Sequence, residues 1–339
     1  MWAGLIHLAV GNAFIGFLEG AILGIVFKLN RLKCVLVMVA ANYFSSWGGG
    51  VFLDNIITGH LSLDLYNAWF WFWTMVVVTF LLTLILEWPF VFFCFCKSPH
   101  RFKRSFWGNL LINSVSYLLL FGWYWAASGT GIYRNMHVVQ PSQMAMPTNG
   151  IVFYISATNG DVCALNFETR KSEEIYQLKS TDEDDRLFVR PSKPASNRWD
   201  ILDSSKLILI QSNLTATARP TPRDEDNEAN STLQAPNGTW FNFGKTPKLG
   251  AAENSGWTFE TGFWPIEGLR GKNSKTGESL YFSLETPFVA WIVRNATHLP
   301  GDYVIFQLGN NQICILETTT RKIAMLDKGY GPVAILNNQ

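Results

Sequence analysis

Long runs of apolar residues dominate the first part of this chain and do not occur in the rest. Each run has the roughly 20 residues that a helix needs to cross the hydrocarbon core of a bilayer. The runs are at about residues 6–27, 34–53, 66–90 and 107–127. Beyond them, short β-branched and aromatic segments alternate with turn residues, which is typical of strands. We therefore predict a transmembrane domain of four helices over residues 1–127, followed by an all-β domain.

Charged residues show the same division of the chain. Residues 1–130 hold seven Lys or Arg and four Asp or Glu, so the other 20 of 27 basic and 22 of 26 acidic residues fall in residues 131–339. About a quarter of the residues in a soluble domain are charged, which excludes an ordinary soluble fold for the first part. The second part is nearly neutral and lacks the concentrated basic face that a nucleic-acid-binding surface needs.

The short connections between the apolar stretches differ in charge. The connection after the second stretch holds Asp54 and Asp64 and no Lys or Arg. The connections after the first and third stretches hold all the basic residues of this region: Lys28, Arg31, Lys33, Lys97, Arg101, Lys103 and Arg104. Because basic loops are retained in the cytoplasm, we predict a multi-pass protein of the inner (plasma) membrane. Both termini and the β domain would then be extracytoplasmic.

The basic residues before the last apolar stretch have two compatible interpretations. A basic cluster beside a span orients the protein in the membrane. Such a cluster also attracts anionic lipids, since each basic residue near an anionic surface contributes about 1 kcal/mol. We therefore assign anionic-lipid contact, as a hypothesis, to Lys97, Arg101, Lys103 and Arg104.

Glycine and proline mark local features of the spans. Gly16, Gly20 and Gly24 recur at every fourth residue, and small residues at this spacing let two helices approach closely in lipid. The three glycines at 48–50 predict a place where the second span can unwind. Pro89 predicts a kink or an end in the third span.

Five polar residues lie within the apolar stretches, where a charged side chain is costly unless it is paired or hydrated. They are Asn12, Glu19, Asn42, Glu87 and Asn113. Asn12 and Glu19 are on one helix face, with Gly16 between them. We predict a polar cluster centred on Asn12 and Glu19, together with Asn42 or Asn113. The cluster would hold the bundle together by hydrogen bonds, form a proton, ion or ligand site, or contact a partner subunit.

The second part of the chain contains an internal repeat. Residues 128–150 predict a linker, and residues 151–339 the β domain, with a long polar insertion at 215–255. Residues 160–171 (GDVCALNFETRK) align with residues 311–322 (NQICILETTTRK). An apolar strand precedes each copy, and each copy ends in the turn Thr-Arg-Lys.

This unit of strand, Asn/Gly turn, strand and Thr-x-Lys turn resembles the blades of bacterial β-propellers, particularly the PQQ-like repeats. In that family the second strand reads Val-x-Ala-Leu-Asp before a Thr-Gly-Lys turn, and residues 162–166 (VCALN) fit the pattern. Arg170 and Arg321 replace the Gly of the turn, and the blade tryptophan motif is missing. The resemblance implies a small propeller-like domain of about four blades. A β-sandwich is the alternative, and PQQ binding is not implied.

Cys163 and Cys314 occupy equivalent positions in the two copies. Equivalent positions on separate blades are usually too far apart for a disulfide. We therefore predict two buried thiols rather than a disulfide bond.

The sequence contains no motif for catalysis, phosphate binding, dinucleotide binding or metal binding, so no catalytic residue, metal site or cofactor is assigned. The leading hypothesis is a non-enzymatic subunit or scaffold of an envelope complex. Its β domain would bind a protein or an envelope component, its helices would contact the lipid bilayer, and homo-oligomerisation is open. The alternative is a transporter or a proton- or ion-conducting subunit that uses Glu19, Glu87 and the asparagines. A membrane enzyme of unknown chemistry is the third hypothesis.

Overall fold

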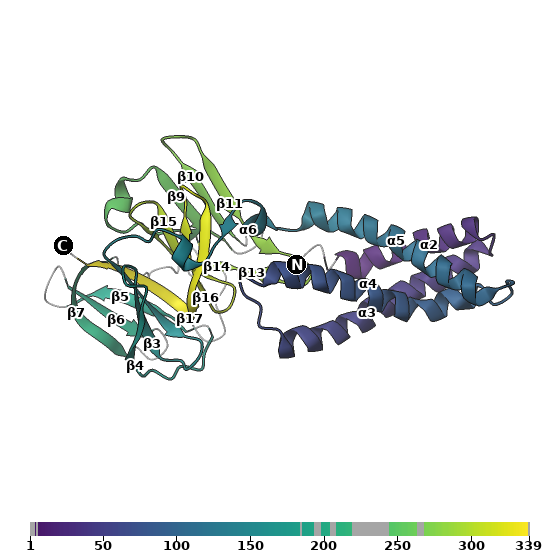
Figure 1. Cartoon of the computed structure of the whole chain (residues 1–339), viewed down its shortest axis with the longest axis horizontal. Coiled ribbons are helices and arrows are strands. Elements are labelled where there is room, and N and C mark those ends of the chain that lie inside the picture. Colours follow the sequence, from purple (N-terminus) through teal and green to yellow (C-terminus); the bar gives the residue numbers. More distant parts are fainter. Residues whose placement is uncertain are drawn as a thin grey trace. The chain divides into compact units, whose positions relative to one another are not determined.

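The chain folds into two compact units. The structure is a computed structural model that describes residues 4, 6–183, 185–192, 198–203, 208–218, 244–262 and 268–337, with side chains except at 54–60, 199 and 213. One unit is Met1–Ser128 together with Glu285–Ala290, and the other is Gly129–Leu284 together with Trp291–Gln339. The first consists mainly of helices and the second mainly of strands (Figure 1). We call them the helical unit and the β unit.

Within its described residues, the helical unit has four helices that are long and apolar enough to cross a membrane. A π-helical turn, η1 (His7–Gly11), runs directly into α2 (Asn12–Val26). The other helices are α3 (Arg31–His60), α4 (Ala68–Cys94) and α5 (Arg101–Ala127). The candidate spans within them are His7–Val26, Arg31–Leu53, Ala68–Cys94 and Arg101–Ala127. The prediction of four helices of membrane-spanning length is therefore confirmed.

An unwound segment at residues 48–50 and an end of the third span at Pro89 are not found. α3 is helical through residues 48–50, and α4 continues past Pro89 to Cys94. An open backbone group in hydrocarbon costs several kcal/mol, so a helix is retained even where Gly and Pro weaken it. The start of α3 follows the expected capping chemistry, because Asn30 Oδ1 accepts a hydrogen bond of 3.0 Å from the amide of Lys33.

The β unit begins within the segment that we expected to be a linker. This segment holds the short helix α6 (Gly131–Arg134), strand β1 (His137–Val138) and the 3-10 turn η2 (Pro141–Gln143). β1 pairs in parallel with β17, with His137 opposite Lys322. Part of the expected linker, His137–Val138, is thus a strand of the sheet.

Among the residues that the structure describes, the remaining elements of the β unit are strands and the 3-10 helix η4 (Gly250–Asn254). They are β2 (Gly150–Ser156), β3 (Val162–Asn166), β4 (Ser172–Tyr176), β5 (Leu187–Pro191), β6 (Arg198–Asp203), β7 (Leu209–Thr217), β8 (Gly244–Lys245), β9 (Trp257–Thr261), β10 (Leu269–Asn273), β11 (Ser279–Phe282), β12 (Leu284–Glu285), β13 (Ala290–Trp291), β14 (Val293–Leu299), β15 (Tyr303–Leu308), β16 (Gln312–Glu317) and β17 (Lys322–Asn337). Of the expected insertion at 215–255, residues 219–243 lie outside the described residues. Its ends contribute to β7, β8 and η4.

The two copies of the repeat form two equivalent three-stranded meanders, β2-β3-β4 and β15-β16-β17. Cys163 lies opposite Tyr154 in the first, and Cys314 lies opposite Phe306 in the second. Both cysteines are free thiols, but only Cys314 is buried, and Cys163 is partly exposed, so the prediction of two buried thiols is wrong for Cys163. Burial raises the pKa of each thiol, which disfavours the reactive thiolate.

The meanders join edge to edge in one curled sheet with the order β14-β15-β16-β17-β2-β3-β4. The long strand β17 makes the junction, since its first part pairs with β16 and its second part with β2. Each blade of a propeller is a separate sheet, so the propeller-like arrangement is not confirmed. The all-β class of the unit is confirmed.

Two hydrophobic cores lie on opposite faces of this sheet. Successive side chains of a strand point to opposite faces, and in β2 Val152 and Tyr154 enter one core while Phe153 and Ile155 enter the other. The second core also contains apolar residues from β5, β6 and β7. A separate sheet, β11-β10-β9-β8, alternates buried and exposed positions along β9, β10 and β11, so one of its faces is open to solvent.

Candidate functional site

Glu19 on α2 is almost fully buried, with 1% of its surface exposed. One carboxyl oxygen accepts a hydrogen bond from Asn42 Nδ2 on α3, and the other accepts one from Ser116 Oγ on α5. Asn42 also donates to the carbonyl of Met38, and Ser116 to the carbonyl of Ile112, which holds both side chains against their own helices. The carboxyl group of Glu19 therefore links three helices.

Glu87 on α4 is equally buried and has a matching pair of partners. Ser45 Oγ on α3 donates to one of its oxygens at 2.7 Å, and Asn113 Nδ2 on α5 donates to the other at 3.2 Å. Asn113 is itself 3.1 Å from Asn109 Oδ1. α3 and α5 thus each supply one donor to Glu19 and one to Glu87.

The two glutamates form one polar centre in the bundle, which we call the carboxyl pair. Their donors are only three residues apart on each of the two helices, Asn42 and Ser45 on α3 and Asn113 and Ser116 on α5, so the carboxyl groups lie near one another. Within the described part of the chain, neither forms an ion pair with a basic side chain. A buried charge needs a compensating charge or a proton. The carboxyl pair is therefore able to hold a proton, or a small cation that prefers oxygen ligands.

Asn12 does not belong to the carboxyl pair. Its Oδ1 accepts a hydrogen bond of 2.9 Å from Ser46 Oγ on α3, and its Nδ2 is 3.3 Å from the carbonyl of Leu8. The structure brings Asn42 to Glu19 and Asn113 to Glu87, whereas Asn12 makes a separate link between α2 and α3. The expected single cluster centred on Asn12 and Glu19 is therefore two groups.

Two serines that the sequence did not single out contribute to this centre. Ser45 and Ser116 donate to the carboxyl pair, yet a lone serine in an apolar helix carries little signal. A helical pattern was nevertheless available in α5. Polar residues recur at spacings of four, four and three, which places them on one face of a helix. They are Ser105, Asn109, Asn113 and Ser116, and all are buried.

The glycine stripe of α2 lies against α3. A Cβ atom added to Gly16 would be 2.5 Å from the Cα atom of Val39, and one added to Gly20 would be 2.4 Å from the Cα atom of Val35. At Gly24 the nearest atom would be Arg31 Cγ, at 2.7 Å. Backbone contact this close brings Asn42 of α3 within reach of Glu19 on α2.

The four basic residues that we assigned to lipid contact behave differently from one another. Arg104 donates to the carbonyl of Phe27 at 3.0 Å and to Ser98 Oγ, so it connects α5 with the end of α2. The guanidinium of Arg101 lies over the ring of Phe92, 5.2 Å from its centre. Lys97 and Lys103 are exposed. Lipid contact by these residues stays a prediction.

In the described part of the β unit, no group of three or more His, Cys, Asp and Glu side chains could hold a metal ion. His298 Nε2 lies 3.1 Å from Asp302 Oδ1, and Ser255 Oγ donates to the same oxygen at 2.5 Å. In a Ser-His-Asp triad the serine bonds to the histidine, so this trio is not a triad.

No known protein family, curated protein or solved structure matches this chain. Similarity to other proteins therefore assigns no activity. The carboxyl pair in the helical unit and the solvent-exposed strands of the β unit are the features from which a function can be inferred.

Proposed function

We propose that the chain is a membrane-anchored subunit that displays its β unit outside the cytoplasm for binding to another protein or an envelope component. The observation that carries the proposal is the contrast between the surfaces of the two units. Of the 30 exposed large hydrophobic side chains in the described residues, 27 lie between residues 6 and 125. A surface of that kind needs lipid around it, whereas the β unit exposes mostly polar side chains.

The orientation follows from the ends of the bundle. Contacts between Lys33 and the carbonyl of Phe93, and between Arg104 and the carbonyl of Phe27, bring both basic connections to one end. His7 Nδ1 and Tyr124 OH are 2.9 Å apart, so the chain enters and leaves the bundle at the other end. If the basic end is cytoplasmic, the β unit is extracytoplasmic.

Cysteine labelling tests this orientation. Cys96 is exposed near the basic end, whereas Cys34, Cys94 and Cys314 are buried. In a Cys163→Ser background, an impermeant maleimide added to intact cells is expected to leave Cys96 unlabelled and to label a cysteine introduced at the exposed Lys272. Labelling of Cys96 in intact cells, without labelling at position 272, would overturn the orientation.

Binding is tested by photocrosslinking from the full chain in its native membrane. The open face of the β11-β10-β9-β8 sheet presents Glu260, Arg270, Lys272 and Tyr281. A photoreactive residue at Tyr281 is expected to give a discrete protein or glycan adduct. The same residue at the exposed Leu118 of α5 is the control and is expected to react with lipid. If Tyr281 and other exposed β-unit positions gave no adduct, the binding proposal would fail.

A second function is favoured by one observation. Among the described residues, the carboxyl pair has serine and asparagine partners and no basic partner. We propose as the alternative that these carboxyl groups exchange protons or small cations within the membrane. Glu19→Gln keeps the size of the side chain and removes its charge, so proteoliposomes with this variant are expected to lose proton or cation flux. Ser46→Ala, which removes a partner of Asn12 only, is the matched control. Equal flux through wild-type and Glu19→Gln protein would exclude this alternative.

A further inference from the structure

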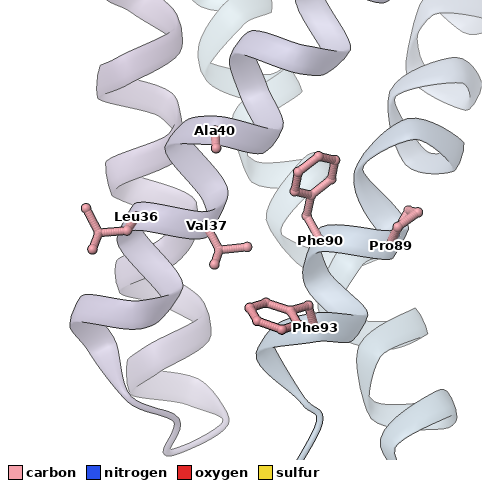
Figure 2. Close-up of a pocket in the computed structure, with 6 residues that line it drawn as sticks. All are labelled: Leu36, Val37, Ala40, Pro89, Phe90 and Phe93. Carbon is pink, nitrogen blue, oxygen red and sulfur yellow. The ribbon is translucent and has the colours of Figure 1, made fainter.

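An apolar groove runs along the outside of the bundle between α3 and α4. Its volume is about 500 Å³, and it is lined by Leu36, Val37, Ala40, Pro89, Phe90 and Phe93. Figure 2 shows Val37 and Ala40 on one helix facing Phe90 and Phe93 on the other. Leu36 and Phe93 are more than half exposed, at 64% and 56%. The groove therefore opens toward the surroundings of the bundle rather than toward its polar centre.

Lys33 lies at one end of this groove. Its ammonium is 4.0 Å from the centre of the Phe93 ring and donates to the Phe93 carbonyl at 2.9 Å. That carbonyl is in the last turn of α4, where it also accepts a hydrogen bond of 3.4 Å from the amide of Cys96. The ammonium also lies 3.4 Å from Cys96 Sγ, as a hydrogen-bond donor. These contacts hold it beside the groove, and since an ammonium has three N–H donors, one remains for a ligand.

The charges around this end are all of one sign. Residues 25–36 and 88–108 contain Lys28, Arg31, Lys33, Lys97, Arg101, Lys103 and Arg104 and no Asp or Glu. From Lys33 to Ala40 the groove follows α3 for seven residues, which corresponds to about 10 Å along the helix. An occupant that fits has an anionic group at the basic end and an apolar chain that extends away from it.

We propose that this groove binds one anionic glycerophospholipid, with an acyl chain along Val37, Ala40 and Phe90 and the phosphate at Lys33. The apolar lining and the adjoining ammonium match the two parts of such a lipid. A second copy of this chain would place apolar side chains along the groove but would leave the basic end without acidic partners. The proposal concerns the helical unit alone and holds whatever the β unit binds.

Native mass spectrometry of the full chain, released from nanodiscs of phosphatidylcholine with a minority of phosphatidylglycerol, tests the proposal. Wild-type protein is expected to retain one phosphatidylglycerol in preference to phosphatidylcholine. Lys33→Gln is expected to weaken phosphatidylglycerol retention about fivefold, the effect of one basic residue at an anionic lipid surface. Lys103→Gln removes an exposed charge at the same end that makes no groove contact, and it is expected to have a smaller effect.

A second variant fills the groove without touching Lys33. Ala40→Phe is expected to abolish retention of the bound lipid, and Val51→Phe, at an exposed position farther along α3, is expected to leave it unchanged. Circular dichroism checks that each variant keeps its helices. Equal loss with Lys33→Gln and Lys103→Gln, or unchanged retention with Ala40→Phe, would overturn the proposal. A dimer that Ala40→Phe dissociates would also overturn it, because the groove would then belong to a second copy.

Discussion

The helical unit and the β unit place polar and apolar side chains in opposite ways. In the helical unit, the buried centre contains two glutamates with their asparagine and serine partners, while large apolar side chains cover the outside. In the β unit, apolar residues from β2, β15, β16 and β17 fill the interior, and the exposed positions of β9 to β11 are mostly polar. The difference is the one expected if lipid surrounds the helical unit and water surrounds the β unit.

The contrast shows which interactions can hold each unit together. Lipid is as apolar as leucine, so burial of apolar surface contributes little to the association of helices in a membrane. Association of these helices therefore depends on two other interactions. One is close backbone packing at Gly16 and Gly20, and the other is hydrogen bonding to Glu19 and Glu87. In water, burial of apolar side chains is the main stabilising contribution, and the β unit relies on it. A change in one unit should therefore leave the other largely unaffected.

The largest expected effect is in the close contact between α2 and α3. Gly20→Ala places a Cβ atom 2.4 Å from the Val35 backbone, so the helices must separate. We expect a loss of about 1–3 kcal/mol, as is typical of overpacking. The measurement is hydrogen exchange of the full chain in detergent, which reports α2 and α3 separately from the strands.

The matched control for Gly20→Ala is Gly122→Ala on α5, where an added Cβ meets nothing within 4 Å. Alanine favours helix over glycine, so this control should be neutral or slightly stabilising. Faster exchange in the β strands with Gly20→Ala would show that the two units are coupled and would contradict the comparison.

In the β unit we expect a smaller change in stability, and this change is a gain rather than a loss. Arg170 and Arg321 occupy equivalent turns with φ values of +56° and +54°, a region that favours glycine. Arg321→Gly is expected to stabilise the β unit by about 1 kcal/mol without changing the helices. Arg170→Gly should gain less, because Arg170 also donates to the carbonyl of Met144 at 3.0 Å. Denaturant unfolding of the strands measures both variants, and destabilisation by Arg321→Gly would disprove the strain.

The smallest expected effect is a pH dependence confined to the β unit. Burial lowers the pKa of His298 below its usual 6.5, and the nearby Asp302 carboxylate offsets part of that shift. His298 therefore binds a proton more readily in the unfolded chain than in the folded one. The free energy of unfolding is highest above about pH 6.5 and falls as the pH drops toward the lower pKa of the folded state. The loss is bounded by about 1.4 kcal/mol for each pH unit.

Unfolding of the strands between about pH 7.5 and pH 5.5 measures this dependence. His298→Gln is expected to flatten the slope, and substitution of the exposed His137 of β1 with Gln serves as the control. A slope that survives in His298→Gln would assign the pH dependence to another group.

The positions of the four long helices could be predicted from the sequence, because each is one continuous stretch of apolar residues. Glu19, Glu87, Asn42 and Asn113 were identifiable as buried, since polar residues in hydrocarbon must find partners. Their pairing was not identifiable. Asn42 reaches Glu19 because the glycines of α2 let α3 approach, and Asn12 bonds instead to Ser46, four residues farther along α3.

The β unit shows where local pattern stops being informative. The repeat predicted two similar strand-turn-strand segments, and both form meanders. The same local pattern occurs in a propeller blade and in a curled sheet, because both contain antiparallel strands that are neighbours in sequence. The choice depends on which outer strands meet, and here β17 pairs with β2.

The sequence by itself determined four membrane-length helices, their buried polar residues and a strand-rich second half, because hydrophobicity and local turn chemistry act over a few neighbouring residues. Only the tertiary structure decided that two glutamates share one polar centre, that a lysine lies beside an apolar groove, and that two meanders form one sheet. Each of these depends on contacts between residues far apart in the chain. Such contacts depend on how closely helices and strands pack, and the sequence of a single segment does not determine that packing.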